Sequence, residues 1–110
     1  MKMHRALVFL MLSCCAITAS ARSYQIKGGP WFACISKDVH KQSTRIAVSG
    51  DQAAFKKFMM QALMSGQCIP LKQGQQVFLQ ETSVLSGVVQ VRPAGATQAY
   101  WTNTEAINTK

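Results

Sequence analysis

The strongest periodic pattern of hydrophobic and polar positions in the chain follows Asp51. Apolar residues recur there at spacings of three and four, which places them on one face of a helix: Ala54, Phe55, Phe58, Met59, Ala62 and Leu63. Lys56 and Lys57 fall on the opposite side. Asp51 can cap the first turn, and Gly66 can end the helix in a left-handed conformation. The pattern predicts a helix over about 52–65, whose apolar face packs on the strands of a sheet.

The segment before this helix carries a weaker apolar stripe. Ser36 can act as an N-cap and Asp38 lies in the first turn. Because β-branched residues follow, we expect a short or irregular helix that ends at Gly50. Further upstream, the apolar cluster at 31–35 predicts contact with the core. Residues 22–30 are polar, rich in glycine and closed by proline, which predicts a flexible lead-in.

After Cys68 the periodicity changes from helical to β. Three runs of alternating or β-branched residues, separated by turn residues, predict strands over 75–82, 85–92 and 98–102, and residues 104–107 suit a last helical turn. We therefore expect an α+β fold with a helical segment at 31–67 and a β segment at 68–110. The length allows one small domain with a marginal core.

The first 21 residues have the organisation of a cleavable signal peptide. Lys2, His4 and Arg5 precede an uncharged and nearly all apolar run, which the small residues at 19–21 end. The apolar run has about a dozen residues, whereas a membrane-spanning helix needs roughly 20. We expect cleavage before Arg22 and a periplasmic or secreted protein with no transmembrane segment in its mature chain.

Lipid attachment is a second, less favoured outcome for the same segment. Cys14 follows the small Ser13, as the acylated cysteine of a lipoprotein does, but Met11 is a poor match at the preceding aliphatic position. Cys15 has Leu12 at that position but has Cys14 in the place of the small residue. Neither cysteine fits the whole pattern, so release after cleavage is favoured over lipoprotein anchoring.

The chain is basic, with 12 Lys and Arg against four Asp and Glu, and has a formal net charge of +8. Removal of Lys2 and Arg5 with the signal peptide leaves a mature charge near +6. Such a charge favours attraction to anionic surfaces. Because export makes nucleic acid an unexpected partner, we expect an anionic cell-wall polymer or an envelope protein instead.

The mature chain keeps two cysteines, Cys34 and Cys68. An oxidising compartment and an even count predict a disulfide between them. Closing a loop of this length restricts the unfolded chain by roughly 3–4 kcal/mol in the loop-entropy model. Without a histidine pair or a CxxC motif, the two cysteines do not suggest a zinc site. No metal or other cofactor is predicted.

Three stretches of the second half follow one another in an order typical of small barrels: CIPLKQGQQVFLQE, GVVQVRPAG and AYWTNTEAI. The second has alternating valines and a glycine turn, and the third has an aromatic pair before a closing turn. Residues 68–107 thereby resemble a bacterial SH3-like small β-barrel, a likeness that covers under half of the mature chain. The layout of helix, cysteine and strands is also similar to small uncharacterised exported proteins of proteobacteria, which implies a compartment and a fold.

Motifs of catalytic sites are not found in the sequence. His40 is the one histidine of the mature chain, and Asp38, two positions away, falls on another face of a helix. The other carboxylates are scattered, and no nucleophile elbow, P-loop or HExxH motif occurs. We expect a protein that is not an enzyme. A small hydrolase would need a pocket that gathers His40 with a carboxylate and a hydroxyl.

Two groups of side chains are the candidate binding residues. The first is an aromatic and cationic patch of Arg92, Tyr100 and Trp101; in the alternative, one ring belongs to the core and the other covers it. The second is a set of cations on the helical half: Lys37, Lys41, Arg45, Lys56 and Lys57. A merely solvated face is the alternative for this second set.

These observations favour a non-catalytic exported binding module that acts on a cell-envelope protein or on peptidoglycan. The SH3-like resemblance implies that aromatic residues line a groove for a peptide or a glycan. The alternative is a periplasmic inhibitor or immunity-type protein that blocks an enzyme or toxin, because a rigid disulfide-bonded domain loses little entropy on binding.

Overall fold

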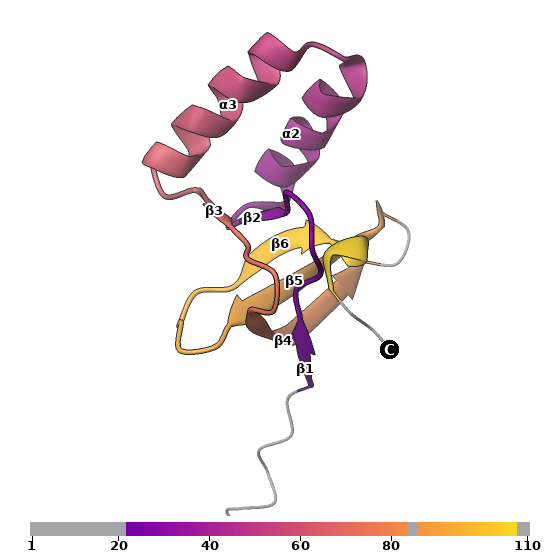
Figure 1. The fold of residues 1–110 in the computed structure, drawn as a ribbon, viewed down its shortest axis with the longest axis vertical. Coiled ribbons are helices and arrows are strands. Elements are labelled where there is room, and N and C mark those ends of the chain that lie inside the picture. Colours follow the sequence, from indigo (N-terminus) through magenta and orange to yellow (C-terminus); the bar gives the residue numbers. More distant parts are fainter. Residues whose placement is uncertain (1–21, 84–85, 108–110) are drawn as a thin grey trace, which may run out of the picture.

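The computed structural model describes residues 22–83 and 86–107 and shows the α+β fold that the sequence predicts. Two helices, α2 (Lys37–Ser49) and α3 (Gln52–Met64), form a hairpin that stands on one end of a β-sheet (Figure 1). The strands are β1 (Ser23–Gln25), β2 (Phe32–Cys34), β3 (Cys68–Pro70), β4 (Gln76–Ser83), β5 (Val88–Pro93) and β6 (Tyr100–Asn103). A 3-10 helix, η2 (Thr104–Ala106), follows β6.

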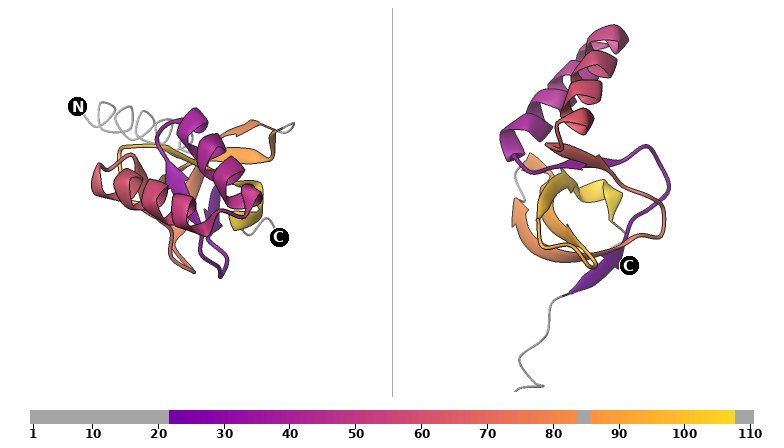
Figure 2. Two further views of the ribbon diagram at one scale, coloured as in Figure 1. Left: turned by 90° about the horizontal axis from the view of Figure 1, so that it is seen from above. Right: turned by 90° about the vertical axis from the view of Figure 1, so that its left-hand side faces the viewer.

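Six strands of the described residues form one antiparallel sheet in the order β1-β4-β5-β6-β2-β3. Strands β4, β5 and β6 follow one another along the chain, and β2 joins the free side of β6. The sheet is curved but does not close, because β1 and β3 are its two edges (Figure 2). The SH3-like barrel expected over residues 68–107 is therefore not confirmed, and two of the six strands come from outside that range.

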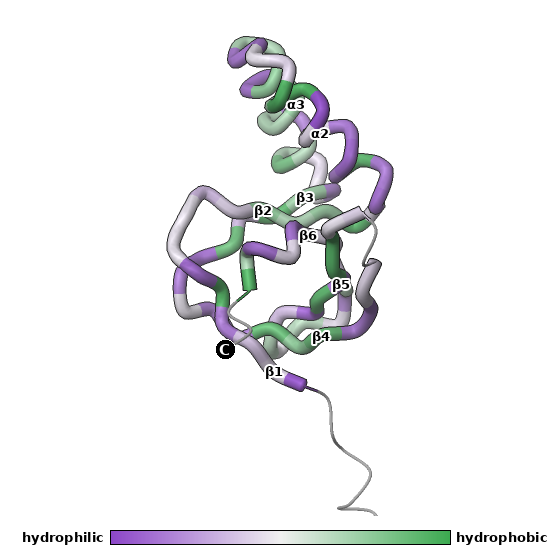
Figure 3. Tube along the Cα trace, turned by 90° about the vertical axis from the view of Figure 1, so that its right-hand side faces the viewer, coloured by the Kyte–Doolittle hydropathy of each residue, from purple (hydrophilic) through white to green (hydrophobic). Residues whose placement is uncertain are grey.

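The main hydrophobic core lies against the inner face of the sheet. Alternation along β5 puts Val89 and Val91 in the core, while Gln90 and Arg92 lie on the opposite face. The other buried members of this core are Ile26, Ala33, Leu71, Val77 and Ile107. Figure 3 shows hydrophobic residues along β4 and β5, whereas much of α2 is hydrophilic. The sheet thus supplies most of its own apolar contacts.

Residues 22–30, for which the sequence predicts a flexible lead-in, contribute to this sheet. Strand β1 pairs with β4, and Ile26 is only 2% exposed and bridges to Ile107. Gly29 has a φ of 137°, and a Cβ on it would lie 2.8 Å from Nε1 of Trp31, so the turn into β2 requires glycine. The composition gave no sign of β1 because three residues between polar neighbours carry no periodic signal.

Both helices begin with the caps that the sequence predicts. The Ser36 Oγ accepts the Val39 N–H at 3.3 Å, and Asp51 Oδ1 accepts the Ala54 N–H at 3.0 Å. Gly50, with a φ of 84°, ends α2 in the left-handed region. Helix α2 is a regular helix of 13 residues rather than the short or irregular one expected. Its packing on β2 and β6 outweighs the low helix propensity of its β-branched residues.

The apolar face of α3 belongs to a second, smaller core. The buried members of this core are Cys34, Met59, Ala62 and Cys68, and the partly buried side chains packed on them are Phe32, Val39, Phe55 and Phe58. Leu63, predicted on the same face, is 41% exposed. The contacts of α3 with the sheet are therefore to the strands β2 and β3, next to α2, and the main core is a separate cluster.

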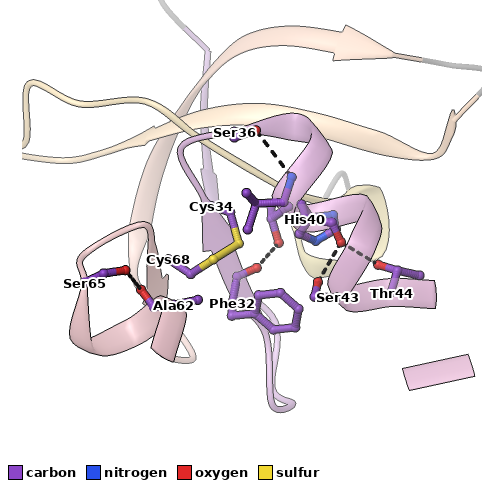
Figure 4. Close-up of a disulfide and its surroundings, with 11 residues drawn as sticks. Phe32, Cys34, Ser36, His40, Ser43, Thr44, Ala62, Ser65 and Cys68 are labelled. Atoms are coloured by element: carbon purple, nitrogen blue, oxygen red, sulfur yellow. Dashed lines mark hydrogen bonds between the residues drawn. A yellow bond between two sulfur atoms is a disulfide. The ribbon is translucent and has the colours of Figure 1, made fainter. Parts of the chain in front are cut away.

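The predicted disulfide between Cys34 and Cys68 is confirmed. The two cysteines face each other in the β2–β3 pair, with their Cα atoms 4.0 Å apart, at the place where the hairpin meets the sheet (Figure 4). Neither described helix is long and apolar enough to cross a bilayer. The disulfide is compatible with an exported protein, whereas the predicted signal peptide and the cysteines at 14 and 15 lie outside the described residues.

Candidate binding site between helix α2 and the sheet

The strand register separates the two aromatic residues of the predicted patch. Tyr100 pairs with Val91 and packs against the main core. Trp101 pairs with Gln90 on the outer face, where alternation along β5 also places Arg92. The structure therefore brings Arg92 and Trp101 to one face of the sheet and turns Tyr100 to the other.

On the outer face, the protein's own cations cover the aromatic rings. The Lys37 Nζ lies 4.9 Å from the ring centroid of Trp101, and the guanidinium carbon of Arg92 lies 5.0 Å from that of Phe78. Arg92 also donates a hydrogen bond to the Ala96 carbonyl at 2.9 Å. These intramolecular contacts engage Arg92 and Trp101, the two patch residues on the outer face, so a ligand would have to displace the contacts.

The five cations predicted on the helical half separate into two groups. Lys37, Lys41 and Arg45 are spaced by four residues on α2 and form a stripe beside the sheet. Lys56 and Lys57 are exposed on α3 and line neither of the two pockets described below. The α2 stripe is therefore the part of this set that is combined with residues of the sheet.

A pocket of about 360 Å³ lies between the α2 stripe and the sheet. Its lining, termed the basic pocket, is His40, Lys41, Thr44 and Arg45 from α2 together with Ser86, Val88 and Asn103. Val88 and Asn103 are paired across β5 and β6, so the strand register sets this wall. The lining holds two cations and no carboxylate, which makes the pocket attractive to an anion.

His40 forms the inner wall of the basic pocket. Its side chain is fully buried, and its ring centroid lies 5.3 Å from that of Phe32 (Figure 4). Within the described part of the chain, neither ring nitrogen has a hydrogen-bond partner. Burial lowers the pKa of His40, and the side chain of Asn103 opposes this shift in part. The Asn103 side chain therefore lies close enough to influence the ring, although this contact does not meet hydrogen-bond geometry.

The backbone of His40 is fixed by the turn that follows it. Its carbonyl accepts hydrogen bonds from the Ser43 Oγ at 2.6 Å and from the Thr44 Oγ1 at 3.1 Å. These contacts are typical of hydroxyl side chains inside helices. They fix the helix backbone at the residue that carries the imidazole.

A second pocket, of about 370 Å³, adjoins the basic pocket. Its apolar lining, which gives it the name apolar pocket, is Pro30, Trp31, Phe32, Ala47, Val48 and Phe55. Ser43, Thr44 and Asn103 complete it, and the last two also line the basic pocket. The two pockets therefore meet at Thr44 and Asn103.

The side chains around the two pockets provide positive charge, hydrogen-bonding groups and apolar surface, which are the usual features of a ligand site. Asp38 is exposed while His40 is buried, and no carboxylate lines either pocket. Over residues 22–83 and 86–107, no group of three His, Cys, Asp or Glu side chains could hold a metal ion.

The sequence identifies the cations of the site but not its opposite wall. The spacing of Lys37, Lys41 and Arg45 is visible in the sequence, whereas Ser86 and Asn103 are brought to α2 only by the β5–β6 register. The spacing of His40, Ser43 and Ala47 places them on one helical face in the sequence. Three such residues do not form an apolar stripe, so the pattern was not informative by itself.

No family model matches the chain, and neither a curated protein nor a solved structure matches it. The site is therefore interpreted from its own geometry and charge.

Proposed function

We propose that the protein is a non-catalytic exported binding module that acts on a component of the cell envelope, an envelope protein or peptidoglycan. The observation that carries this proposal is the basic pocket, in which the cations Lys41 and Arg45 face Asn103 of the sheet and no carboxylate is present. The net positive charge and the resemblance of residues 68–107 to SH3-like domains support it.

The basic pocket suits a carboxylate or another anionic group. Hydrogen bonds between charged groups are stronger than neutral ones, and the fork of an arginine side chain fits a carboxylate well. The side chains of Lys41 and Arg45 are exposed, so an anion can reach them from solvent, whereas both ring nitrogens of His40 are covered by protein atoms.

A sedimentation assay with purified cell wall and a pull-down from envelope extracts test this function. We expect the mature protein to be retained in at least one of them, with retention that falls as salt concentration rises. The variant Lys41→Ala/Arg45→Ala should lose about tenfold or more in affinity. The matched control Lys56→Ala/Lys57→Ala removes the same charge from α3 and should bind like the parent. Equal losses in both variants would show attraction by net charge and contradict the proposed site.

A second candidate function, the inhibitor or immunity-type protein, is favoured by the projecting hairpin. Val48 and Met64 are 81% and 82% exposed, and Met60 is 55% exposed, although all three are apolar. A rigid hairpin with such side chains suits insertion into the cleft of another protein. If the pull-down retains an envelope hydrolase, its inhibition by the parent and the loss of inhibition in Met64→Asp would favour this function over the first.

A further inference from the structure

We propose that the two adjoining pockets together form a site for the C-terminus of a peptide whose last residue is apolar. The inference rests on the proposed binding function and names the class of ligand. The basic pocket would take the terminal carboxylate, and the apolar pocket would take the terminal side chain.

The proximity of the two pockets is the first support. Thr44 and Asn103 line both, so the pockets adjoin at these two residues. Each pocket, at about 360 and 370 Å³, has a size suited to a small group or side chain. A ligand that carries a charge next to an apolar group fills both, whereas a simple anion fills one.

The charge distribution sets the orientation of the ligand. Lys41 and Arg45 line the basic pocket alone, and no ionisable side chain lines the apolar pocket. A carboxylate bound by Lys41 and Arg45 would meet no opposing negative charge, because no carboxylate lines the basic pocket. The geometry therefore separates the anionic end from the apolar end of the ligand.

The apolar pocket accounts for an exposed side chain that the fold does not use. Val48 is 81% exposed at its rim, next to the rings of Trp31 and Phe55 in its wall. Covering such a surface is favourable by roughly 25 cal/mol for each Å² of apolar area removed from water. An aliphatic or aromatic side chain of a ligand would supply that cover.

The boundary between the pockets favours a peptide over a fatty acid. The α-carbon of a C-terminal residue carries an amide N–H beside the carboxylate and the side chain, and a second amide precedes it along the peptide. The Thr44 hydroxyl and the Asn103 amide stand at this boundary and offer hydrogen-bonding atoms to those groups. A hydrocarbon chain would offer no hydrogen-bonding group to the Asn103 amide or to the oxygen of Thr44, which can still accept, and this costs binding free energy.

Tryptophan fluorescence can test the inference, because Trp31 lines the apolar pocket and Trp101, the other tryptophan, lines neither. In a Trp101→Phe protein, Trp31 is the sole reporter. The probes are four: acetyl-Ala-Ala-Phe with a free carboxylate, its C-terminal amide, acetyl-Ala-Ala-Ser with a free carboxylate, and decanoate. We expect the first probe to bind about tenfold or more tightly than each of the others.

Two variants and a control assign the preference to the pockets. Arg45→Gln should remove the preference for carboxylate over amide, and Val48→Ser should reduce the preference for Phe over Ser. Lys57→Gln, on α3, should change neither. The inference is overturned if the Ser-ended peptide or decanoate binds as tightly as the Phe-ended peptide, or if no peptide binds. If in these cases the protein still sediments with cell wall in a manner that depends on Lys41 and Arg45, the proposed function stands without it.

Discussion

The sheet and the helical hairpin differ in what they bury. In the sheet, Val77 and Val91 are fully buried, Ile26 is 2% exposed, and all three belong to one apolar cluster. In the hairpin, α3 buries only Met59 and Ala62, and its other apolar side chains are partly or fully exposed. The sheet is therefore a self-sufficient core, whereas the hairpin depends on its contacts with the sheet.

The buried residues of α2 make the contrast sharper, because both of them, His40 and Ser43, are polar. A structural helix buries apolar side chains where it meets a sheet. Here the contact between helix and sheet contains a fully buried imidazole, beside two pockets. The difference indicates that the apolar core of the sheet contributes more to stability than the polar contact between α2 and the sheet.

Removal of the disulfide should have the largest effect on stability, because the bond links β2 and β3 at the base of the hairpin. For Cys34→Ala/Cys68→Ala, we expect the free energy of unfolding to fall by about 4 kcal/mol, through loss of a cross-link that spans 34 residues. Urea unfolding followed by circular dichroism measures the change against the oxidised parent. A loss under about 1 kcal/mol would mean that packing alone holds the hairpin on the sheet.

A cavity in the core of the sheet should have the second largest effect on the free energy of unfolding. For Ile26→Ala, we expect a loss of about 3 kcal/mol, within the usual range for a buried isoleucine, because the side chain is 2% exposed. The matched control is Val48→Ala in the hairpin, at 81% exposure, which should stay within about 0.5 kcal/mol of the parent. Similar losses in the two variants would remove the distinction between the regions. Urea unfolding of both proteins gives the values.

The sequence could predict the elements that carry a long periodic pattern. Helix α3 and strands β4, β5 and β6 were found because each combines an apolar repeat with turn residues at its ends. Strands β1 and β3 have three residues each, too few for a repeat, and depend on pairing with distant segments. The barrel was expected over residues 68–107 alone, and this range leaves out β1 and β2, which belong to the observed open sheet.

The candidate site was predicted only in its charged part. The i, i+4 spacing of Lys37, Lys41 and Arg45 is a local property of one helix. The position of Asn103 opposite them follows from the β5–β6 register and from the packing of α2 on β6, which are tertiary properties. The same register places Tyr100 in the core and Trp101 outside, a choice that the adjacent positions alone left open.

Truncation of a side chain in the small core beside α3 should have an intermediate effect on the free energy of unfolding. Phe58 packs against the cluster of Cys34, Met59, Ala62 and Cys68 but stays partly exposed. For Phe58→Ala, we expect a loss of about 2 kcal/mol, below the 3–5 kcal/mol of a fully buried phenylalanine. Lys57→Ala, its exposed neighbour, should cost under about 0.5 kcal/mol. If thermal unfolding of Phe58→Ala matches the parent, the face of α3 does not support the fold and is itself a candidate binding surface.

The smallest effect concerns pH and tests the polar joint directly. Burial lowers the pKa of His40 in the folded protein below its usual value of 6.5. Below pH 6.5 the unfolded chain therefore takes up a proton that the folded protein excludes, so stability is present above that pH and falls as pH drops toward the folded pKa. One proton gives a slope of at most about 1.4 kcal/mol per pH unit. The stability of a protein of residues 22–110, which contain no other histidine, should thus fall between pH 6.5 and 5 by more than that of its His40→Phe variant. Parallel urea unfolding of both proteins at pH 5, 6, 7 and 8 measures the difference, and equal slopes would show that the imidazole is not held neutral at the joint.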